Sequence, residues 1–272
     1  MVPGPYPGSV RAVIVLSVCS LKGGVGKTSV ILGLASAALA RGIPTLVVDL
    51  DPQADATTGL DVAARRESTV ADVLANPRRG EIARAVAPSG WAGDQPGVLD
   101  VMLGSEASTD HDYSTRPRSM KALATALGKV PWYDLVLLDC PPSLRGLTRT
   151  GLIASDRTLV VSEPAIFSVA AADRALRAVD ALRRTDAPHL QPLGILVNRF
   201  RERSPEHRYR LEEMVGLFGP LVLRPPLPDR SAVQQSQGAT TPVHRWHGHG
   251  GSELAAVYDV HLDRVLRAGP TR

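Results

Sequence analysis

The stretch SLKGGVGKT near the amino terminus combines glycines, lysines and a hydroxyl in one short loop, and these residue types could bind phosphate. In a phosphate loop, backbone N–H groups surround the phosphates, a lysine contacts the β- and γ-oxygens, and a Ser or Thr hydroxyl contacts Mg²⁺. Gly26, Lys27 and Thr28 fit the end of the pattern G-x-x-x-x-G-K-[ST], but Leu21 occupies the position of its first glycine. A second lysine, Lys22, directly follows Leu21. Lys27 already matches the one lysine of the pattern, so the pattern does not explain Lys22.

Two further stretches end in carboxylates. Asp49 and Asp51 follow the apolar run TLVV, and residues two apart on a strand point to the same face, so both could enter one site. For Asp49 the alternative is a polar residue that only finishes a strand. Asp139 ends the apolar run LVLL. Such a run is a weak motif by itself and a strong one behind a phosphate loop.

Alternating strand and helix patterns place these motifs. The apolar run RAVIVLSV directly before the loop is typical of a strand buried on both faces of a parallel sheet. Expected strands are 11–18, 45–50, 98–103, 134–139, 158–162 and 194–198, and expected helices are 28–41, 70–74, 120–127, 169–183, 205–218 and 252–266. We predict an α/β fold, a doubly wound and mostly parallel sheet with helices on both faces, which binds ligands at the carboxyl ends of its strands. Residues 65–96 are the least regular part.

Composition bounds the remaining choices. A chain of 272 residues that is 44% hydrophobic can bury the core of one large domain, which we place at 11–272 behind a loose tail at 1–10. No apolar run reaches the roughly 18 residues of a membrane span. Cys19 and Cys140 are too few for a disulfide framework, which favours the cytoplasm. Only four of the 31 basic residues are lysines, and this arginine bias looks like genome composition, so the net charge of +4 is weak evidence for a polyanionic partner.

The sequence KGGVGKT resembles the deviant Walker A motif of the ParA/MinD family of ATPases. The resemblance implies that Lys27 contacts the phosphates of the chain's own ATP, whereas Lys22 crosses a dimer interface to the nucleotide of the other subunit. ATP would then be part of the interface, and its binding would favour a homodimer. The implied nucleotide-contacting residues of the loop are Gly23, Gly24, Val25, Gly26, Lys27, Thr28 and Ser29. The alternative is a glycine-rich turn with chance lysines.

The carboxylate stretches extend this resemblance. DLDPQ is similar to the family's D-x-D-P-Q sequence, which implies that Asp51 orients the attacking water and that Asp49 lies near Mg²⁺. LVLLD looks like the family's Walker B segment, in which Asp139 would hold the Mg²⁺ shell through water. The implied catalytic residues are Lys22, Lys27 and Asp51, and the implied metal-site residues are Thr28, Asp49 and Asp139.

Two later positions resemble the family's base site. Asn198 ends the run GILV, where family members use an asparagine amide to read the adenine edge, because an amide both donates and accepts. Pro228 and Asp229 match a proline-containing segment that closes over the base through backbone groups. For Asn198 the alternative is an ordinary turn residue at the end of a strand.

Family members differ in what their ATP dimers bind. Those that partition chromosomes bind DNA non-specifically through basic residues, and positions 199–210 here hold five arginines and two glutamates. Such a patch could contact DNA phosphates and make binding salt-dependent, and the alternative is a solvated loop. The arginines concerned are Arg199, Arg201, Arg203, Arg208 and Arg210, extended by Arg245. MinD-like members dock a terminal amphipathic helix on the membrane, but 252–266 has few lysines or large aromatic residues, which disfavours such docking.

These features predict a Mg²⁺-dependent ATPase switch that dimerises on ATP and binds double-stranded DNA non-specifically. The resemblance implies that hydrolysis is slow and is stimulated by a ParB-like or other activating protein. We expect the protein in the cytoplasm, on the nucleoid, where it would act in chromosome or plasmid partitioning. The alternative function is an orphan ParA/MinD-like ATPase that positions a division or polar protein complex and needs no centromere protein.

Overall fold

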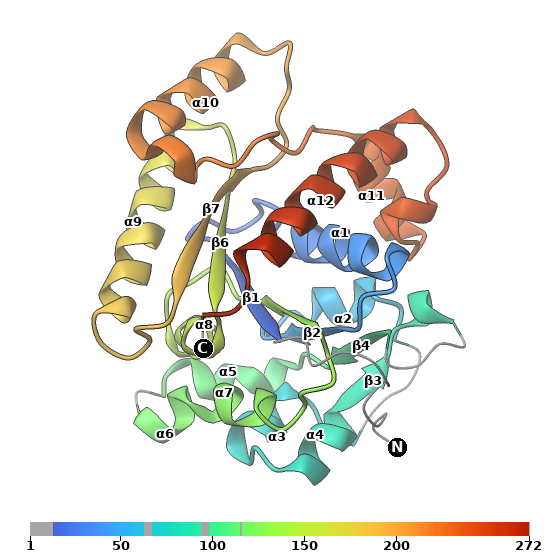
Figure 1. Ribbon diagram of the computed structural model, residues 1–272, viewed down its shortest axis with the longest axis vertical. Helices are drawn as coiled ribbons and strands as arrows, with labels where there is room; N and C mark the ends of the chain where they lie inside the picture. Colours follow the sequence, from blue (N-terminus) through green and yellow to red (C-terminus); the bar gives the residue numbers. More distant parts are fainter. Residues whose placement is uncertain (1–12, 63–66, 94–97, 115, 272) are drawn as a thin grey trace.

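The computed structural model describes residues 13–62, 67–93, 98–114 and 116–271, so the tail expected at 1–10 lies outside the described residues. Its strands form one sheet in the order β3-β4-β2-β5-β1-β6-β7 (Figure 1). The strands are β1 (Ile14–Cys19), β2 (Thr45–Asp49), β3 (Val86–Pro88), β4 (Leu99–Met102), β5 (Leu135–Asp139), β6 (Arg157–Ser162) and β7 (Gln191–Val197). Neighbouring strands are parallel except for β3, which is antiparallel to β4.

Helices cover both faces of this sheet, which confirms the predicted fold class. They are α1 (Lys27–Ala40), α2 (Asp55–Gly59), α3 (Val70–Ala75), α4 (Arg79–Ala85), α5 (Thr109–Asp112), α6 (Pro117–Met120), α7 (Ala122–Leu127), α8 (Gly146–Ala154), α9 (Ile166–Arg183), α10 (Pro205–Phe218), α11 (Ser231–Gly238) and α12 (His249–Ala268). Short 3₁₀ turns lie at 90–92, 106–108, 219–221 and 243–245. Figure 1 shows α1, α11 and α12 together on one face, with α12 lying along α1.

The two faces have separate apolar cores because successive residues of a strand point to opposite sides. Along β1, Ile14, Leu16 and Val18 join the core that contains side chains of α1 and α12. Val15 and Cys19 join the other core, which contains side chains of α3, α7, α8, α9 and α10. A strand buried on both faces reads as a continuous apolar run, and this is the pattern that RAVIVLSV shows.

The described part of 65–96, residues 67–93, is more regular than expected, since it contains α3, α4 and the edge strand β3. A capping box begins α3, in which the Asp72 carboxylate accepts hydrogen bonds from the backbone N–H and the hydroxyl of Thr69. With its three residues, β3 is too short to show an alternating pattern. The single helix expected over 120–127 is also divided, because Lys121 (φ −94°, ψ 0°) separates α6 from α7.

The sheet brings the sequence motifs to one edge. Val18 of β1 lies opposite Asp139 of β5, and Asp139 lies opposite Asp49 of β2. The phosphate loop and both carboxylate stretches therefore meet at the carboxyl ends of three adjacent central strands. No helix within the described residues combines the length and apolarity that a bilayer span requires.

Candidate nucleotide-binding site

The phosphate loop connects the end of β1 with the start of α1. Gly24 and Gly26 have φ angles of 77° and 88°, a left-handed conformation that favours glycine. A Cβ atom on Gly26 would lie 2.3 Å from Nδ2 of Asn198, so the loop passes too close to the end of β7 for a side chain. The backbone therefore favours glycine at Gly24 and requires it at Gly26.

The first turn of α1 presents backbone N–H groups to the loop. Within the described residues no side chain caps this turn, and the turn holds no acidic residue. N–H groups at the start of a helix carry a partial positive charge and bind anions. Lys27, the first residue of α1, is only 6% exposed and adds its positive charge at the same place. Together the loop and the helix can bind a phosphate group.

Thr28, Asp139 and Asp49 form a polar cluster next to the loop. The Thr28 hydroxyl donates a hydrogen bond to Oδ2 of Asp139 at 2.7 Å. The other carboxylate oxygen of Asp139, Oδ1, is buried and has no hydrogen-bond partner among the described residues. Burial raises the pKa of Asp139 well above its usual range, and the negative charge of Asp49 raises it further. The two neighbouring carboxylates thus disfavour one another's charge.

This cluster fits a divalent cation. A buried carboxylate oxygen without a partner costs free energy, and Mg²⁺ takes oxygen ligands of this kind. A cation would also remove the repulsion between Asp49 and Asp139. Thr28 and Asp139 are placed to hold the ion, because the hydroxyl and the free oxygen belong to side chains that already touch.

Asp49 is oriented by residues that the sequence analysis did not single out. Its Oδ2 accepts hydrogen bonds from the backbone N–H and the hydroxyl of Thr57, both at 2.8 Å. Its Oδ1 accepts from the Asp51 N–H at 3.3 Å. Burial raises the pKa of Asp49, and the Thr57 hydrogen bonds oppose this effect. A Cβ on Gly104 would lie 2.7 Å from the Asp49 carboxyl carbon, so Gly104 leaves room for Asp49.

Asp51 lies beyond the end of β2, where it is partly exposed. Its Oδ1 accepts a hydrogen bond from the Gln53 N–H at 3.1 Å. The charge of Asp51 contributes to the raised pKa values of Asp49 and Asp139, so its carboxylate lies near both. The sequence prediction that the two aspartates of DLDPQ share one site agrees with this placement.

Asn198 ties the end of β7 to the phosphate loop. Its Nδ2 donates to the Val25 carbonyl at 2.8 Å, and its Oδ1 accepts from the Arg199 N–H at 2.9 Å. The segment with Pro228 and Asp229 lies beside the residues that follow Asn198, because the Asp229 N–H donates to the Phe200 carbonyl at 2.9 Å. Of the residues expected to place a base, Asn198 is therefore adjacent to the phosphate loop, and Pro228 and Asp229 are adjacent to the residues after Asn198.

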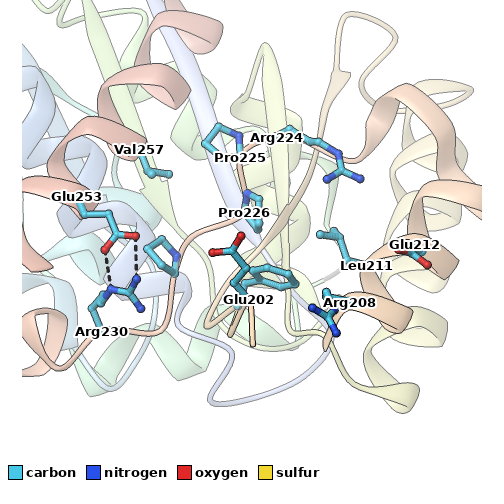
Figure 2. Close-up of a pocket in the computed structure, with 12 residues that line it drawn as sticks. Glu202, Arg208, Leu211, Glu212, Arg224, Pro225, Pro226, Arg230, Glu253 and Val257 are labelled. Carbon is cyan, nitrogen blue, oxygen red and sulfur yellow. Dashed lines mark hydrogen bonds and ion pairs between the residues drawn. The ribbon is translucent and has the colours of Figure 1, made fainter. Parts of the chain in front are cut away.

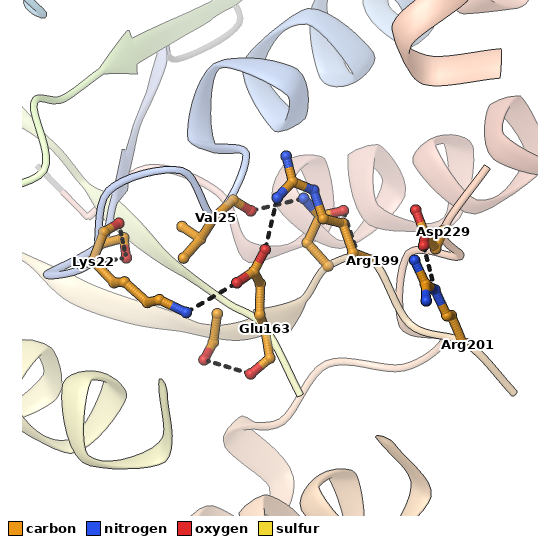
Figure 3. A network of polar contacts seen from close by, with 9 residues as sticks. Lys22, Val25, Glu163, Arg199, Arg201 and Asp229 are labelled. Carbon is orange, nitrogen blue, oxygen red and sulfur yellow. Dashed lines mark hydrogen bonds and ion pairs between the residues drawn. The ribbon is translucent and has the colours of Figure 1, made fainter. Parts of the chain in front are cut away.

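Lys22 extends toward Glu163, which directly follows β6. Its Nζ lies 3.1 Å from Oε2 of Glu163, and Nη1 of Arg199 lies 2.8 Å from Oε1 of the same carboxylate (Figure 3). Glu163 was not found by sequence reasoning, since it belongs to none of the motifs. Only the fold, which places the end of β6 next to the loop after β1, reveals the contact.

The arginines expected to bind DNA divide into two groups. Arg199, Arg201 and Arg210 form ion pairs with Glu163, with Asp229, and with Glu206 and Glu213, respectively. Arg245 donates to the Trp91 carbonyl at 2.9 Å. Arg203 and Arg208 are exposed and form no ion pair within the described residues.

A cavity of about 460 Å³ lies between α10, α12 and the segment 224–230 (Figure 2). Its apolar lining includes Phe200, Leu211 and Pro228, and its charged rim includes Arg208 and Glu253. No residue of the phosphate loop lines it. This cavity is thus separate from the phosphate-binding end of the site.

A mostly parallel sheet that carries this loop and these carboxylates at its strand ends defines a P-loop nucleotide-binding protein. A family model described as AAA domain, AAA_31, matches residues 13–192. The chromosome-partitioning ATPase Soj of Thermus thermophilus is 30% identical over 261 residues, which cover 93% of this chain and 97% of Soj. The chain therefore belongs to this AAA domain family and to its ParA/MinD members, as the loop motif indicated.

Two solved structures support this assignment of the fold. Cobyrinic acid a,c-diamide synthase from Mycobacterium smegmatis, solved with ADP and magnesium, has a TM-score of 0.75 and 27% identity, over 96% of this chain and 99% of that chain. Cyanothece McdA, solved with ATP in a substituted form, has a TM-score of 0.81 over 94% and 97% of the two chains. At 18% identity, the likeness to McdA concerns the fold alone.

Proposed function

We propose that this chain is an ATPase switch that binds Mg²⁺-ATP and dimerises around it. The different placement of the two lysines in one phosphate loop carries this proposal. Lys27 is buried at the start of α1, where the chain's own phosphates would lie. The Lys22 side chain is 42% exposed and extends to Glu163. One lysine suffices for the chain's own phosphates, so Lys22 is available to a second subunit.

The remaining residues of the site have separate tasks in this proposal. Backbone N–H groups of residues 23–29 bind the phosphates, together with the Lys27 ammonium. Thr28 and Asp139 would hold Mg²⁺, which supplies positive charge against the triphosphate, and Asp49 stays beside them. Asp51 orients a water molecule toward the γ-phosphate.

The base end of the site is the second part of the proposal. Asn198 is fixed between the loop and β7, and Pro228 and Asp229 lie on the neighbouring segment. We place adenine at this end because phosphates bound at the start of α1 leave the rest of the nucleotide directed toward the ends of β7 and its following segments. Contacts through backbone groups of 228–229 would leave the Asp229 carboxylate free for Arg201.

For the biological role we propose chromosome or plasmid partitioning, with a cytoplasmic, nucleoid-bound ATP homodimer and a ParB-like activator of slow hydrolysis. Relatives named as partitioning proteins support this role, among them Soj and the ParA of Caulobacter vibrioides. Arg203 and Arg208, which are exposed and have no ion-pair partner among the described residues, are suited to non-specific contacts with the phosphates of duplex DNA.

The second candidate role is the positioning of a division or polar protein complex. The observation that favours it is the internal pairing of Arg199, Arg201 and Arg210, which leaves less positive charge for DNA than the sequence predicts. Such a switch would still dimerise on ATP, but a protein partner would recognise the ATP-bound dimer.

Sedimentation velocity without nucleotide, with Mg²⁺-ADP and with a Mg²⁺-bound non-hydrolysable ATP analogue tests the switch. We expect a monomer in the first two states and a dimer in the third. A monomer in all three states, in samples that bind the analogue, would contradict the proposal. Binding of the dimer to non-specific duplex DNA over a salt series tests the first role, because partitioning requires it. Absence of binding would exclude partitioning, whereas the positioning of a protein complex is compatible with either result.

A further inference from the structure

Glu163 holds two cations on one carboxylate. Oε2 contacts Lys22 and Oε1 contacts Arg199, so each carboxylate oxygen has its own partner (Figure 3). The Glu163 side chain is 19% exposed, and those of Lys22 and Arg199 are 42% and 50% exposed. The carboxylate is thus the more enclosed member of the group, and the two cations approach it from the solvent side.

The backbone and the side chain of Lys22 are held independently. The Lys22 N–H donates to the Ser20 hydroxyl at 3.1 Å, and this hydroxyl donates to the Lys22 carbonyl at 3.2 Å. Within the described residues, the Lys22 ammonium contacts no acidic group other than Glu163. The ammonium can therefore leave Glu163 by side-chain rotation alone, while the loop keeps its shape.

Arg199 is anchored at the base end of the site. It has a φ angle of 54°, and its N–H donates to Oδ1 of Asn198, which in turn bonds the phosphate loop through Val25. Because its backbone is fixed in this way, Arg199 can keep its hold on Glu163 when Lys22 departs.

We propose that Glu163 is a positioning residue that restrains Lys22 on its own subunit until a second nucleotide-bound copy of this chain displaces it. This inference rests on the proposed function, in which Lys22 crosses to the other subunit. Arg199 has the opposite effect on dimerisation. When Lys22 moves to the other subunit's phosphates, Arg199 neutralises the carboxylate that it leaves, so no unpaired negative charge faces the incoming triphosphate.

The direction in which each substitution should change dimerisation follows from this arrangement. Glu163→Gln removes the restraint on both copies of Lys22, so the dimer should form more readily. Arg199→Gln leaves the Glu163 carboxylate without a counterion after Lys22 departs, so the dimer should form less readily. Partly exposed ion pairs are individually weak, but two are broken in each dimer, and we expect the dimer Kd to fall about tenfold in Glu163→Gln.

The test is sedimentation velocity of the full chain with Mg²⁺ and a non-hydrolysable ATP analogue. Glu163→Gln should lower the dimer Kd, Arg199→Gln should raise it, and the double variant should behave as Glu163→Gln. In a Lys22→Ala background, Glu163→Gln should change nothing, because Glu163 acts only through Lys22. The matched control is Asp173→Asn, which removes an exposed carboxylate that pairs with Arg177 on α9 and should leave the dimer Kd unchanged.

The outcomes separate the inference from the proposed function. If the wild-type protein dimerises with a Kd equal to or lower than that of Glu163→Gln, Glu163 does not restrain Lys22. That result would leave the proposed ATP-dependent dimerisation unaffected. Monomers of both proteins, at concentrations of analogue that saturate them, overturn both. Thermal unfolding of each variant distinguishes a change in dimerisation from a general loss of stability.

Discussion

The side-chain amide of Asn198 donates a hydrogen bond to the Val25 carbonyl at 2.8 Å, and so joins the end of β7 to a loop that lies 173 residues earlier. Gly26 lies directly under this amide with a φ angle of 88°. The contact makes the phosphate loop part of a rigid frame, since the loop is attached to β1 at one end, to α1 at the other, and to the end of β7 through Val25.

Gly26→Ala should therefore abolish nucleotide binding. The new methyl group would lie 2.3 Å from Nδ2 of Asn198 in a conformation that alanine rarely adopts, so the loop or β7 must move. The control is Gly216→Ala on α10, where a Cβ meets nothing within 4 Å. This control should retain binding and gain about 0.5–1 kcal/mol of stability from better helix propensity. Isothermal titration with an ATP analogue measures the binding. Wild-type affinity in Gly26→Ala would show that the close approach of Gly26 to Asn198 does not hold the loop in a rigid frame.

Lys22→Ala should bind ATP with nearly wild-type affinity and lose hydrolysis. The exposed Lys22 side chain extends to Glu163, whereas the chain's own phosphates depend on the buried Lys27 and the start of α1. Lys27→Ala is the matched comparison, and it should weaken binding itself. Measurements of nucleotide affinity and phosphate release on both variants separate the two tasks. Normal turnover by Lys22→Ala would show that this lysine does not act across the interface.

Much of this site could be predicted because its residues form local motifs. The loop, DLDPQ and LVLLD each combine an apolar strand with polar residues at its end, and parallel strands bring such ends to one edge. Thr57 and Glu163 were missed for a different reason. Their partners Asp49 and Lys22 are joined to them by tertiary contacts, at separations of 8 and 141 residues, and no spacing rule links such pairs. The pairing of the arginines likewise needed the side-chain positions.

Asp51→Ala should accumulate the ATP-bound dimer. Asp51 is partly exposed next to the buried Asp49 and Asp139. Its removal should leave the phosphate loop and the residues of the Mg²⁺ site in place, but the Asp51 carboxylate would no longer orient the attacking water. The expected result is a dimer peak with Mg²⁺-ATP on size-exclusion chromatography that persists for much longer than that of the wild type. Asp55→Ala, an exposed carboxylate at the start of α2, is the control and should return to monomer at the wild-type rate. If Asp51→Ala stays monomeric in ATP, the assignment of Asp51 as the residue that orients the attacking water is wrong.

Arg203 and Arg208 should carry most of any DNA affinity of the patch, because they are exposed and have no acidic partner within the described residues. Replacing both with Glu should weaken binding of the ATP dimer to duplex DNA at least tenfold and flatten its salt dependence, with ATPase activity retained. The comparison is Arg210→Gln, which removes an arginine that already pairs with Glu206 and Glu213 and should have a smaller effect. Fluorescence anisotropy over a salt series measures both, and equal losses would indicate that internal pairing does not decide the DNA contacts.

His261 should make the protein less stable in acid. This residue of α12 is 2% exposed, its Nε2 donates to the Pro225 carbonyl at 2.8 Å, and its Nδ1 has no partner among the described residues. Burial lowers the pKa of His261 to about 4, and the charge of Arg264 acts in the same direction. The unfolded chain, with a histidine pKa near 6.5, therefore binds more protons than the folded chain between these values.

The resulting stability is fully present above about pH 6.5 and is lost as the pH falls toward 4. The loss should be about 1 kcal/mol between pH 7.5 and pH 5.5, since one pKa unit corresponds to about 1.4 kcal/mol. Urea unfolding at these two pH values should give a smaller decrease for His261→Gln, whose amide can still donate to Pro225 but does not titrate. His247→Gln, at an exposed histidine, should keep the wild-type decrease. Equal decreases in all three proteins would show that the acid sensitivity arises elsewhere in the fold.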